Sequence, residues 1–273
     1  MAKNSYPIKY WSYSSLVSYL RNPLAWHKRY VEQVYDTPST PASVIGRSAH
    51  KALEHFYQDV PKERAIELGL EYLRDVPDFE IDFGKARKVV DKKQKRLQME
   101  SEYLQAIGFY LAKPPKHKVL GVEVKGFAKI PGVMLPVKAV SDLVVVSKAD
   151  PAEVDIVDHK FVDSFGSFEH DNQLFMIQAL FNYYTVMSEF GVPVGRFIVY
   201  ECKKRRNKDG SPQLRRHIID FRDHEEEFRV FHQLLVDTTK DLRTRKIFLP
   251  NPSDMFEGKN SLDIYRLGLT DNE

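Results

Sequence analysis

Two short segments place ionisable side chains inside runs that are otherwise hydrophobic. Asp142 lies in the run VSDLV, and Asp158 and Lys160 lie in the run IVDHK. Both runs have the composition of a buried strand, on which alternate residues share a face, so Asp158 and Lys160 should point the same way. A buried carboxylate is costly unless it is paired or bound to a metal. Since Lys160 supplies one charge for two carboxylates, a divalent cation between Asp142 and Asp158 would satisfy both.

The ligands of such a site indicate which metal and which reaction it would serve. Two carboxylates and the backbone carbonyl of His159 form a hard oxygen site, which suits Mg²⁺ or Mn²⁺. Lys160 could orient or help to deprotonate an attacking water, or it could neutralise charge that develops on a phosphate. This is the chemistry of phosphodiester hydrolysis. The alternative is an ordinary Asp158–Lys160 pair at a strand end and an unrelated Asp142.

The elements that must position these residues follow from periodicity and from turn residues. Helices are expected over residues 12–22, 25–31, 43–59, 61–72, 85–111, 170–190 and 223–246, and strands over 118–130, 135–147, 154–161, 195–203 and 213–221. Short turns join the first three strands, which predicts an antiparallel meander. The fold class is therefore α/β, in the sense of mixed α+β around one central sheet. We expect a single domain over 1–273, with a helical insertion or lobe at 61–115 and a C-terminal tail at 250–273.

Composition excludes several classes of protein. The chain has 273 residues, of which 42% are hydrophobic and 29% charged, so global disorder is excluded. It has no apolar run long enough to span a bilayer, no signal-like N-terminus, and one cysteine, Cys202. We therefore expect a cytoplasmic, intracellular protein with no membrane partner and no disulfide. The net charge is only +3, but the stretches 85–96 and 203–216 are rich in lysine and arginine. They are either polyanion-binding surfaces or a solvated helix face and hairpin.

Five segments in a fixed order resemble a known family. They are SYSSL with Asn22-Pro23, GRSAH ending at His50, AVSD ending at Asp142, DHK at 158–160, and Gln173-Leu174. Together they resemble the PD-(D/E)xK nucleases of the RecB-like exonuclease group, which includes the CRISPR-adaptation exonucleases and many phage recombination nucleases. The resemblance spans residues 12 to about 252. It implies a restriction-endonuclease-like mixed sheet flanked by helices.

The resemblance also implies roles for the matched residues. His50, Asp142 and Asp158 would be metal ligands, Lys160 the catalytic lysine, and Gln173 a residue near the active site that contacts DNA or orients the lysine. Glu54 lies four residues after His50, hence on one helix face, and is either an accessory ligand or an exposed carboxylate. Glu123, on the first predicted strand, could line the cleft or bind a second metal ion.

The sequence departs from the family pattern at the iron–sulfur ligands. Many relatives hold such a cluster with four cysteines, whereas here Asn22 takes the first position and residues 249–269 contain no cysteine. Cys202 alone cannot hold a cluster, so we predict none. The family tyrosine and glycine are replaced by Ile177 and Ala139. The missing cluster and small size are compatible with a phage or mobile-element nuclease that acts in the host cytoplasm.

The expected substrate is DNA, either single-stranded or duplex with an end, cut in recombination, repair or end processing. Phosphate contacts are expected from basic residues in the two charged stretches: Lys88, Lys92, Lys203, Lys204, Arg205, Arg206, Arg215 and Arg216. Tyr10, Trp11 and Tyr13 are either stacking residues or core. A helicase or recombination protein, or a second copy of the chain, is an expected partner. Two alternatives stay open: a nicking or structure-specific endonuclease of the same fold, and a non-catalytic DNA-binding or assembly subunit.

Overall fold

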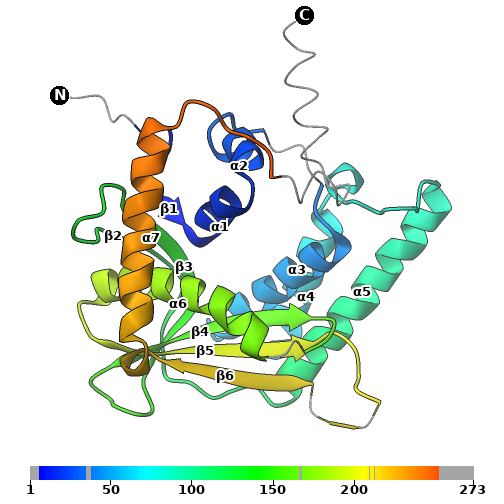
Figure 1. Cartoon of the computed structure of the whole chain (residues 1–273). Helices are drawn as coiled ribbons and strands as arrows, with labels where there is room; N and C mark the ends of the chain where they lie inside the picture. Colours follow the sequence, from blue (N-terminus) through cyan, green and yellow to red (C-terminus); the bar gives the residue numbers. More distant parts are fainter. Residues whose placement is uncertain (1–5, 35–37, 166–167, 209, 212, 252–273) are drawn as a thin grey trace, which may run out of the picture.

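The computed structural model describes residues 6–34, 38–165, 168–208, 210–211 and 213–251, with the side chains of 168–174 outside this part. It is built on a central mixed sheet, as the sequence predicts, with six strands where five were expected (Figure 1). The strands are β1 (Trp11–Ser12), β2 (Val119–Ala128), β3 (Val137–Val146), β4 (Val154–Val162), β5 (Val194–Lys203) and β6 (Leu214–Asp220). The helices are α1 (Tyr13–Arg21), α2 (Pro23–Tyr30), α3 (Pro41–Phe56), α4 (Lys62–Asp75), α5 (Val89–Ala112), α6 (Phe168–Phe190) and α7 (Glu225–Thr244).

The predicted meander is confirmed, because β2, β3 and β4 pair in sequence and antiparallel. The helix α6 then connects β4 to β5, and these two strands run parallel along their whole length. The strand β6 pairs antiparallel with β5 and ends the sheet. The sequence analysis missed β1, which is only two residues long and pairs parallel with β3. A strand this short leaves no periodic signal in the sequence.

The two faces of the sheet pack against different helices (Figure 1). One hydrophobic cluster joins the sheet to α1, α2, α6 and α7. The second joins the other face to α3, α4 and α5. The helices of residues 61–115 thus contribute buried side chains to the same cluster as three central strands. That packing positions α3, which carries His50.

Helix ends follow local sequence rules. Ser12 caps α1 by accepting a hydrogen bond from the amide of Ser15, and Asn22 caps α2 in the same way, with Pro23 at its first position. The helix α5 begins at Val89, four residues later than expected from the charge pattern. Gly84 has a positive φ of 59° just before this segment, so the chain turns there instead of continuing into a helix.

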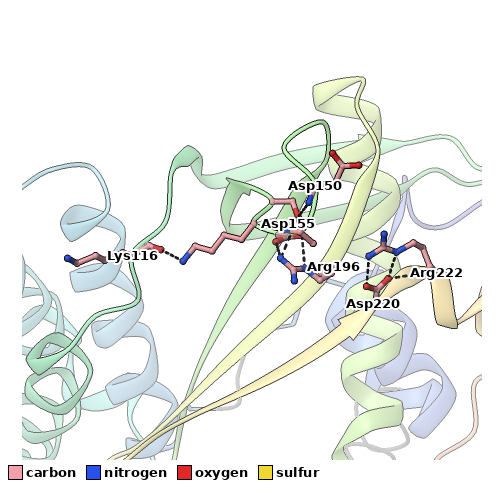
Figure 2. A network of polar contacts seen from close by, with 9 residues as sticks. Lys116, Asp150, Asp155, Arg196, Asp220 and Arg222 are labelled. Carbon is pink, nitrogen blue, oxygen red and sulfur yellow. Dashed lines mark hydrogen bonds and ion pairs between the residues drawn. The ribbon is translucent and has the colours of Figure 1, made fainter.

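A polar network fixes the end of the sheet at which β4 and β5 begin (Figure 2). Asp155 on β4 is fully buried, and both of its carboxylate oxygens accept hydrogen bonds from Arg196 on β5, at 3.2 and 2.6 Å. The Arg196 guanidinium also reaches the Ser147 hydroxyl at 3.5 Å. Near it, Arg222 forms a two-point ion pair with Asp220 at the surface. The fork of Arg196 thereby holds the parallel register of β4 and β5.

In the described part of the chain, no helix is both long and apolar enough to cross a membrane.

Candidate active site

The site lies at a gap in the hydrogen-bond ladder of β3. Because β2 pairs along β3 from Val137 to Val145, the strands β1 and β4 must share its other edge. On that edge β1 pairs with residues 137–138, and β4 pairs from Leu143 onward. Residues 139–142 therefore have neither β1 nor β4 beside them, and β3 and β4 separate at this point. Strands that diverge leave room for polar groups and a ligand.

Asp142 stands at the point of separation. Its Oδ2 accepts a hydrogen bond of 2.7 Å from the backbone N–H of His159 on β4. The Nδ1 atoms of His159 and of His50 lie 3.3 and 3.4 Å from the same oxygen. The carboxylate thus satisfies a strand amide that the broken ladder leaves without a partner. His50 and Asp142, two of the predicted ligands, are brought together.

Glu123 lies opposite Asp142, because the pairs on either side of it in the β2–β3 ladder are in register. Its φ is +50°, a left-handed conformation that is rare and strained for a residue with a side chain. A Cβ at Gly121 would lie 2.5 Å from Cγ2 of Val124, so the bend around Glu123 requires a glycine there. Such strain is held by surrounding packing and is typical of functional sites.

The bend moves side chains to the other face of the sheet. Val122 and Val124 would share a face on a regular strand, yet Val122 packs in the cluster of α3–α5 and Val124 in the cluster of α6. Ser141 and Leu143 on β3 behave alike: the Ser141 hydroxyl donates to Asn182 of α6 at 2.6 Å, whereas Leu143 faces α3–α5. In both strands the regular alternation of side chains is interrupted at the Glu123–Asp142 pair. As a result, Glu123 and Asp142 point toward α3.

Three side chains could hold a metal ion together. One ligand atom each from His50, Glu123 and Asp142 lies within 4.8 Å of the other two. They line a cavity of about 420 Å³, together with Arg47, Lys51, Glu54, Tyr72 and Val140. Two carboxylates and an imidazole are suitable ligands for a divalent cation. Glu123, expected only as an accessory residue, is thus as close to the centre of the site as His50.

Asp158 and Lys160 point toward α6 and α1, as their alternation on β4 requires. The Lys160 ammonium lies 2.8 Å from Oδ2 of Asp158. Oδ1 of the same carboxylate accepts a hydrogen bond of 2.7 Å from the side-chain amide of Gln178 on α6. Tyr13, half-buried at the start of α1, is close enough for its pKa to respond to both charges. The predicted Asp158–Lys160 pair therefore exists, next to the cluster around Asp142 and not inside it.

The charges of the site are strongly coupled. Burial raises the pKa of Glu123, and the Asp142 carboxylate raises it further, to about 7. Burial opposes the charge of His50, but Asp142 more than offsets this and raises the pKa of His50 to about 9. Burial would also raise the pKa of Asp142, but the two histidines lower it well below the usual value. Without a metal ion, the cluster thus carries its charge on the His50–Asp142 pair.

In the Asp158–Lys160 pair the pKa of the carboxyl group is raised, whereas that of Asp142 is lowered. Burial raises the pKa of Asp158, and Lys160 offsets this only in part because the nearby Asp142 carboxylate adds repulsion. Burial would lower the pKa of Lys160, but the carboxylates of Asp158 and Asp142 outweigh it and raise the pKa. The cation-free site therefore has an excess of carboxylates, a condition that a divalent cation would relieve.

Other predicted site residues are placed as follows. Glu54 lines the cavity and pairs with Lys51 at 2.9 Å. The His159 ring is buried in the α3–α5 face, stacked on Tyr57 with 5.8 Å between ring centroids. Gln173 lies in α6, but its side chain is outside the described residues. Trp11 is core, since it is fully buried and its Nε1 donates to Thr239.

Sequence reasoning missed Gln178. The signal was present, because Gln178, Asn182 and Thr185 recur with helical spacing in residues 175–187 of α6, which are otherwise apolar or aromatic. Gln178 contacts Asp158, and Asn182 contacts Ser141, the neighbour of Asp142. A polar stripe on a buried helix facing a strand with acidic residues indicates hydrogen bonds to those residues.

The β5–β6 hairpin carries the second basic stretch, and its lysines differ in burial and in contacts. The Lys204 side chain is buried, and its ammonium pairs with Asp163 at 3.1 Å. Lys203 lies over the ring of Phe165 at 5.6 Å and hydrogen-bonds Asn207. Because its side chain is buried, Lys204 fixes the loop after β4 and does not face DNA, so the prediction that it contacts DNA is wrong.

Two arginines of the hairpin region also have carboxylate partners. Arg205 pairs with Glu102 of α5 at 2.9 Å, which ties the hairpin to that helix. Arg215 pairs with the buried Glu201 at 2.5 Å and lies over the Phe165 ring. Both guanidinium groups keep part of their surface in solvent, so each can still meet a phosphate.

The remaining predicted DNA-binding residues are at the surface. Lys88, Arg206 and Arg216 are exposed. Lys92 is half-buried, with its ammonium 5.7 Å from the centre of the Phe83 ring.

Comparison with known proteins identifies the superfamily. The sequence profile of the PD-(D/E)XK nuclease superfamily matches residues 10–255. The chain therefore belongs to this superfamily, which indicates a metal-dependent nuclease. No curated protein matches the chain. Among solved structures, one titled "Crystal structure of SSO0001" is 11% identical over 84% of this chain and 83% of that chain, with a TM-score of 0.31.

Proposed function

We propose that the protein is a Mg²⁺- or Mn²⁺-dependent DNA exonuclease of the RecB-like group, acting on DNA ends in recombination or repair. One observation carries this proposal: His50, Glu123 and Asp142 converge within 4.8 Å, beside the Asp158–Lys160 pair, where β3 and β4 separate. Nuclease chemistry of this superfamily needs such a combination of metal ligands and a lysine.

The residues present fit a divalent cation. His50, Glu123 and Asp142 would hold it, and Asp158 would approach it from β4. The N–H and C=O of one strand residue point to the same edge, and the His159 N–H points to Asp142. The His159 carbonyl therefore faces the same gap, as the proposed backbone ligand. When bound, the cation would activate a water molecule and offset charge on the scissile phosphate.

In the cation-free protein Lys160 is a cation and not a base. Its pKa is raised by its carboxylate neighbours, so the cation-free protein keeps it protonated at neutral pH. A protonated lysine cannot accept a proton from water, but it can orient the water and bind a phosphate oxygen. Asp158 and Gln178 would hold the ammonium and carboxylate in place for this task.

The basic residues would bind the phosphate backbone without reading sequence. Those that are exposed or half-buried are Lys88, Lys92, Lys203, Arg205, Arg206, Arg215 and Arg216. The contact between Arg205 and Glu102 brings the hairpin and α5 together, so their charges would form one surface. A helicase or recombination protein, or a second copy of the chain, would present the DNA end.

The test uses end-labelled linear single- and double-stranded DNA and a closed circle, in Mg²⁺ or Mn²⁺. We expect the wild type to shorten linear DNA and spare the circle, and Lys160→Ala to leave both substrates uncut. The matched control is Lys240→Ala, which removes an exposed lysine on α7 and should cut like the wild type. Cutting of the circle would replace the exonuclease by an endonuclease. No cutting by the wild type in either metal would leave a non-catalytic DNA-binding or assembly subunit.

A further inference from the structure

The outward side chains of β2 and β3 beyond the candidate metal cluster form a distinct strip. The cross-strand pairs there are Lys125 with Val140 and Phe127 with Lys138. These four point away from the first hydrophobic cluster, because the alternate residues Gly126 and Ala128 are buried on its side. Together with Tyr10, which precedes β1, we call them the β2–β3 strip.

The strip contains an aromatic ring, that of Phe127, which is not part of either hydrophobic cluster. Phe127 is 51% exposed, a large amount for an aromatic residue within a paired strand. The Lys138 ammonium lies 4.8 Å from the centre of the Tyr10 ring and 5.5 Å from that of Phe127. The two rings meet edge to face at 5.6 Å. A cation is thus held between two aromatic rings at the surface.

The strip is continuous with the candidate active site. Val140 lines the cavity that contains His50, Glu123 and Asp142. Lys138, which pairs with Phe127, lies four residues before Asp142 on β3. This corresponds to a distance of about 13 Å along the strand. A chain molecule that is bound at the cavity and extends along β3 would therefore cross Phe127.

The chemistry of the strip identifies what would bind there. Lys125 and Lys138 are its only charged members, so it complements the phosphates of a nucleic acid. Its aromatic rings would stack on bases. The bases of a duplex already stack on one another and face inward, so an aromatic platform favours an unpaired strand.

We propose that the β2–β3 strip binds unpaired nucleotides next to the scissile phosphate, with a base stacked on Phe127 and a phosphate at Lys138. The inference rests on the proposed nuclease function. It adds that the strand being cut is single-stranded on this side of the site, so a duplex end must be opened before it enters.

Binding without hydrolysis tests the strip directly. Fluorescence anisotropy would measure the Kd of labelled oligothymidylate, of a blunt duplex, and of an abasic strand of equal length, all in EDTA. We expect Phe127→Ala to weaken oligothymidylate binding about tenfold, because one stacking contact is lost. The abasic strand, which has no base to stack, should bind this variant as it binds the wild type. Lys138→Ala should weaken both strands and lower the slope of log Kd against log salt by about one.

Matched variants separate stacking from folding. Phe127→Trp should bind as tightly as the wild type, and Phe127→Leu, which keeps an apolar side chain without a ring, should behave like Phe127→Ala. Ile218→Ala, an exposed position on β6, should change nothing. Urea unfolding of each variant would exclude a loss of structure.

The outcomes distinguish this inference from the function on which it rests. If Phe127→Ala binds oligothymidylate as the wild type does, the strip is not a base platform, whether or not the protein cuts DNA. If Phe127→Ala loses binding but the wild type hydrolyses no DNA in either metal, the nuclease proposal fails and the strip remains as a single-strand binding site. Equal loss of the abasic strand in Phe127→Ala would also overturn the stacking assignment.

Discussion

The β3–β4 ladder covers residues 154–157 of β4. Near each end of this ladder β4 buries a carboxylate, Asp155 at the closed end and Asp158 at the open end, and the two carboxylates are satisfied differently. Asp155 is 1% exposed and bound at two points by Arg196, where β3, β4 and β5 are all paired (Figure 2). Asp158 faces a single lysine, where β3 and β4 have separated and Asp142 adds a further negative charge. A buried acid with a matched guanidinium is part of the structure. A buried acid whose neighbours leave charge unbalanced indicates a ligand.

The largest effect is expected at the open end. Lys160→Ala should lower the rate of DNA hydrolysis by about 10²- to 10⁴-fold, as expected for the loss of a positioned charge that contacts the reacting phosphate. Its stability should fall as well because Asp158 loses its cation, but by less than about 3–5 kcal/mol, since the raised pKa of Asp158 lets this carboxyl group take up a proton. Single-turnover cleavage and urea unfolding measure the two quantities. A loss of activity that merely follows a loss of folded protein would contradict the assignment.

At the closed end, a substitution should lower stability and leave the rate of hydrolysis unchanged. Arg196→Ala leaves Asp155 as a buried and unpaired charge, so the free energy of unfolding should fall by about 3–5 kcal/mol. Hydrolysis per folded molecule should be unchanged. Adding Asp155→Asn should restore part of the stability, because the remaining side chain is neutral. If Arg196→Ala alone abolishes activity while the protein stays folded, the two ends are not separate in function.

A pH series sharpens the comparison at Glu123. Its folded pKa is about 7, above the usual value, so the folded state binds a proton more tightly than the unfolded state. Stability is therefore lost as pH rises toward 7. In EDTA, Glu123→Gln should stabilise the protein at pH 8 by about 1–3 kcal/mol and change it little at pH 4. The same substitution should reduce the rise in melting temperature that Mn²⁺ gives the wild type. A destabilised variant at pH 8 would contradict this explanation.

The smallest effect is expected at the surface pair beside Arg196. Arg222 also binds a carboxylate, Asp220, at two points, but its side chain is 59% exposed. Since exposed pairs are screened by water and salt, Arg222→Ala should leave the free energy of unfolding almost unchanged. Comparing it with Arg196→Ala in one denaturation series tests whether burial, and not the number of hydrogen bonds, decides the cost.

Local sequence patterns predicted most of the framework and the acids of the site. Asp142, Asp158 and Lys160 stood out because a charged residue inside an apolar strand is costly, which is a property of a few neighbouring residues. The three-strand meander followed from its short turns. The predicted restriction-endonuclease-like sheet agrees with the six-stranded mixed sheet and with the superfamily.

Features that depend on distant contacts were not predicted. The bend at Glu123 arises from the pairing of β2 with β3, and no local signal fixes its positive φ. Lys204 appeared as one of a run of surface charges, but the course of the loop after β4 buries it beside Asp163. The parallel pairing of β1 with β3 joins Trp11 to Val137 across all the intervening helices. Each is set by tertiary structure, which periodicity does not report.

The position of β1 also has a consequence for how the chain acquires its site. The acids Glu123, Asp142 and Asp158 belong to one compact unit, β2–β3–β4, whose strands are neighbours in sequence and need only short loops to pair. Trp11 must close a loop of more than a hundred residues, an entropic cost that slows the formation of contacts. We expect the acids to gather early in folding, and the opening between β1 and β4 to take shape only when the N-terminal segment docks. With the proposed nuclease function, a newly made chain would then be unable to cut DNA until its N-terminal segment docks.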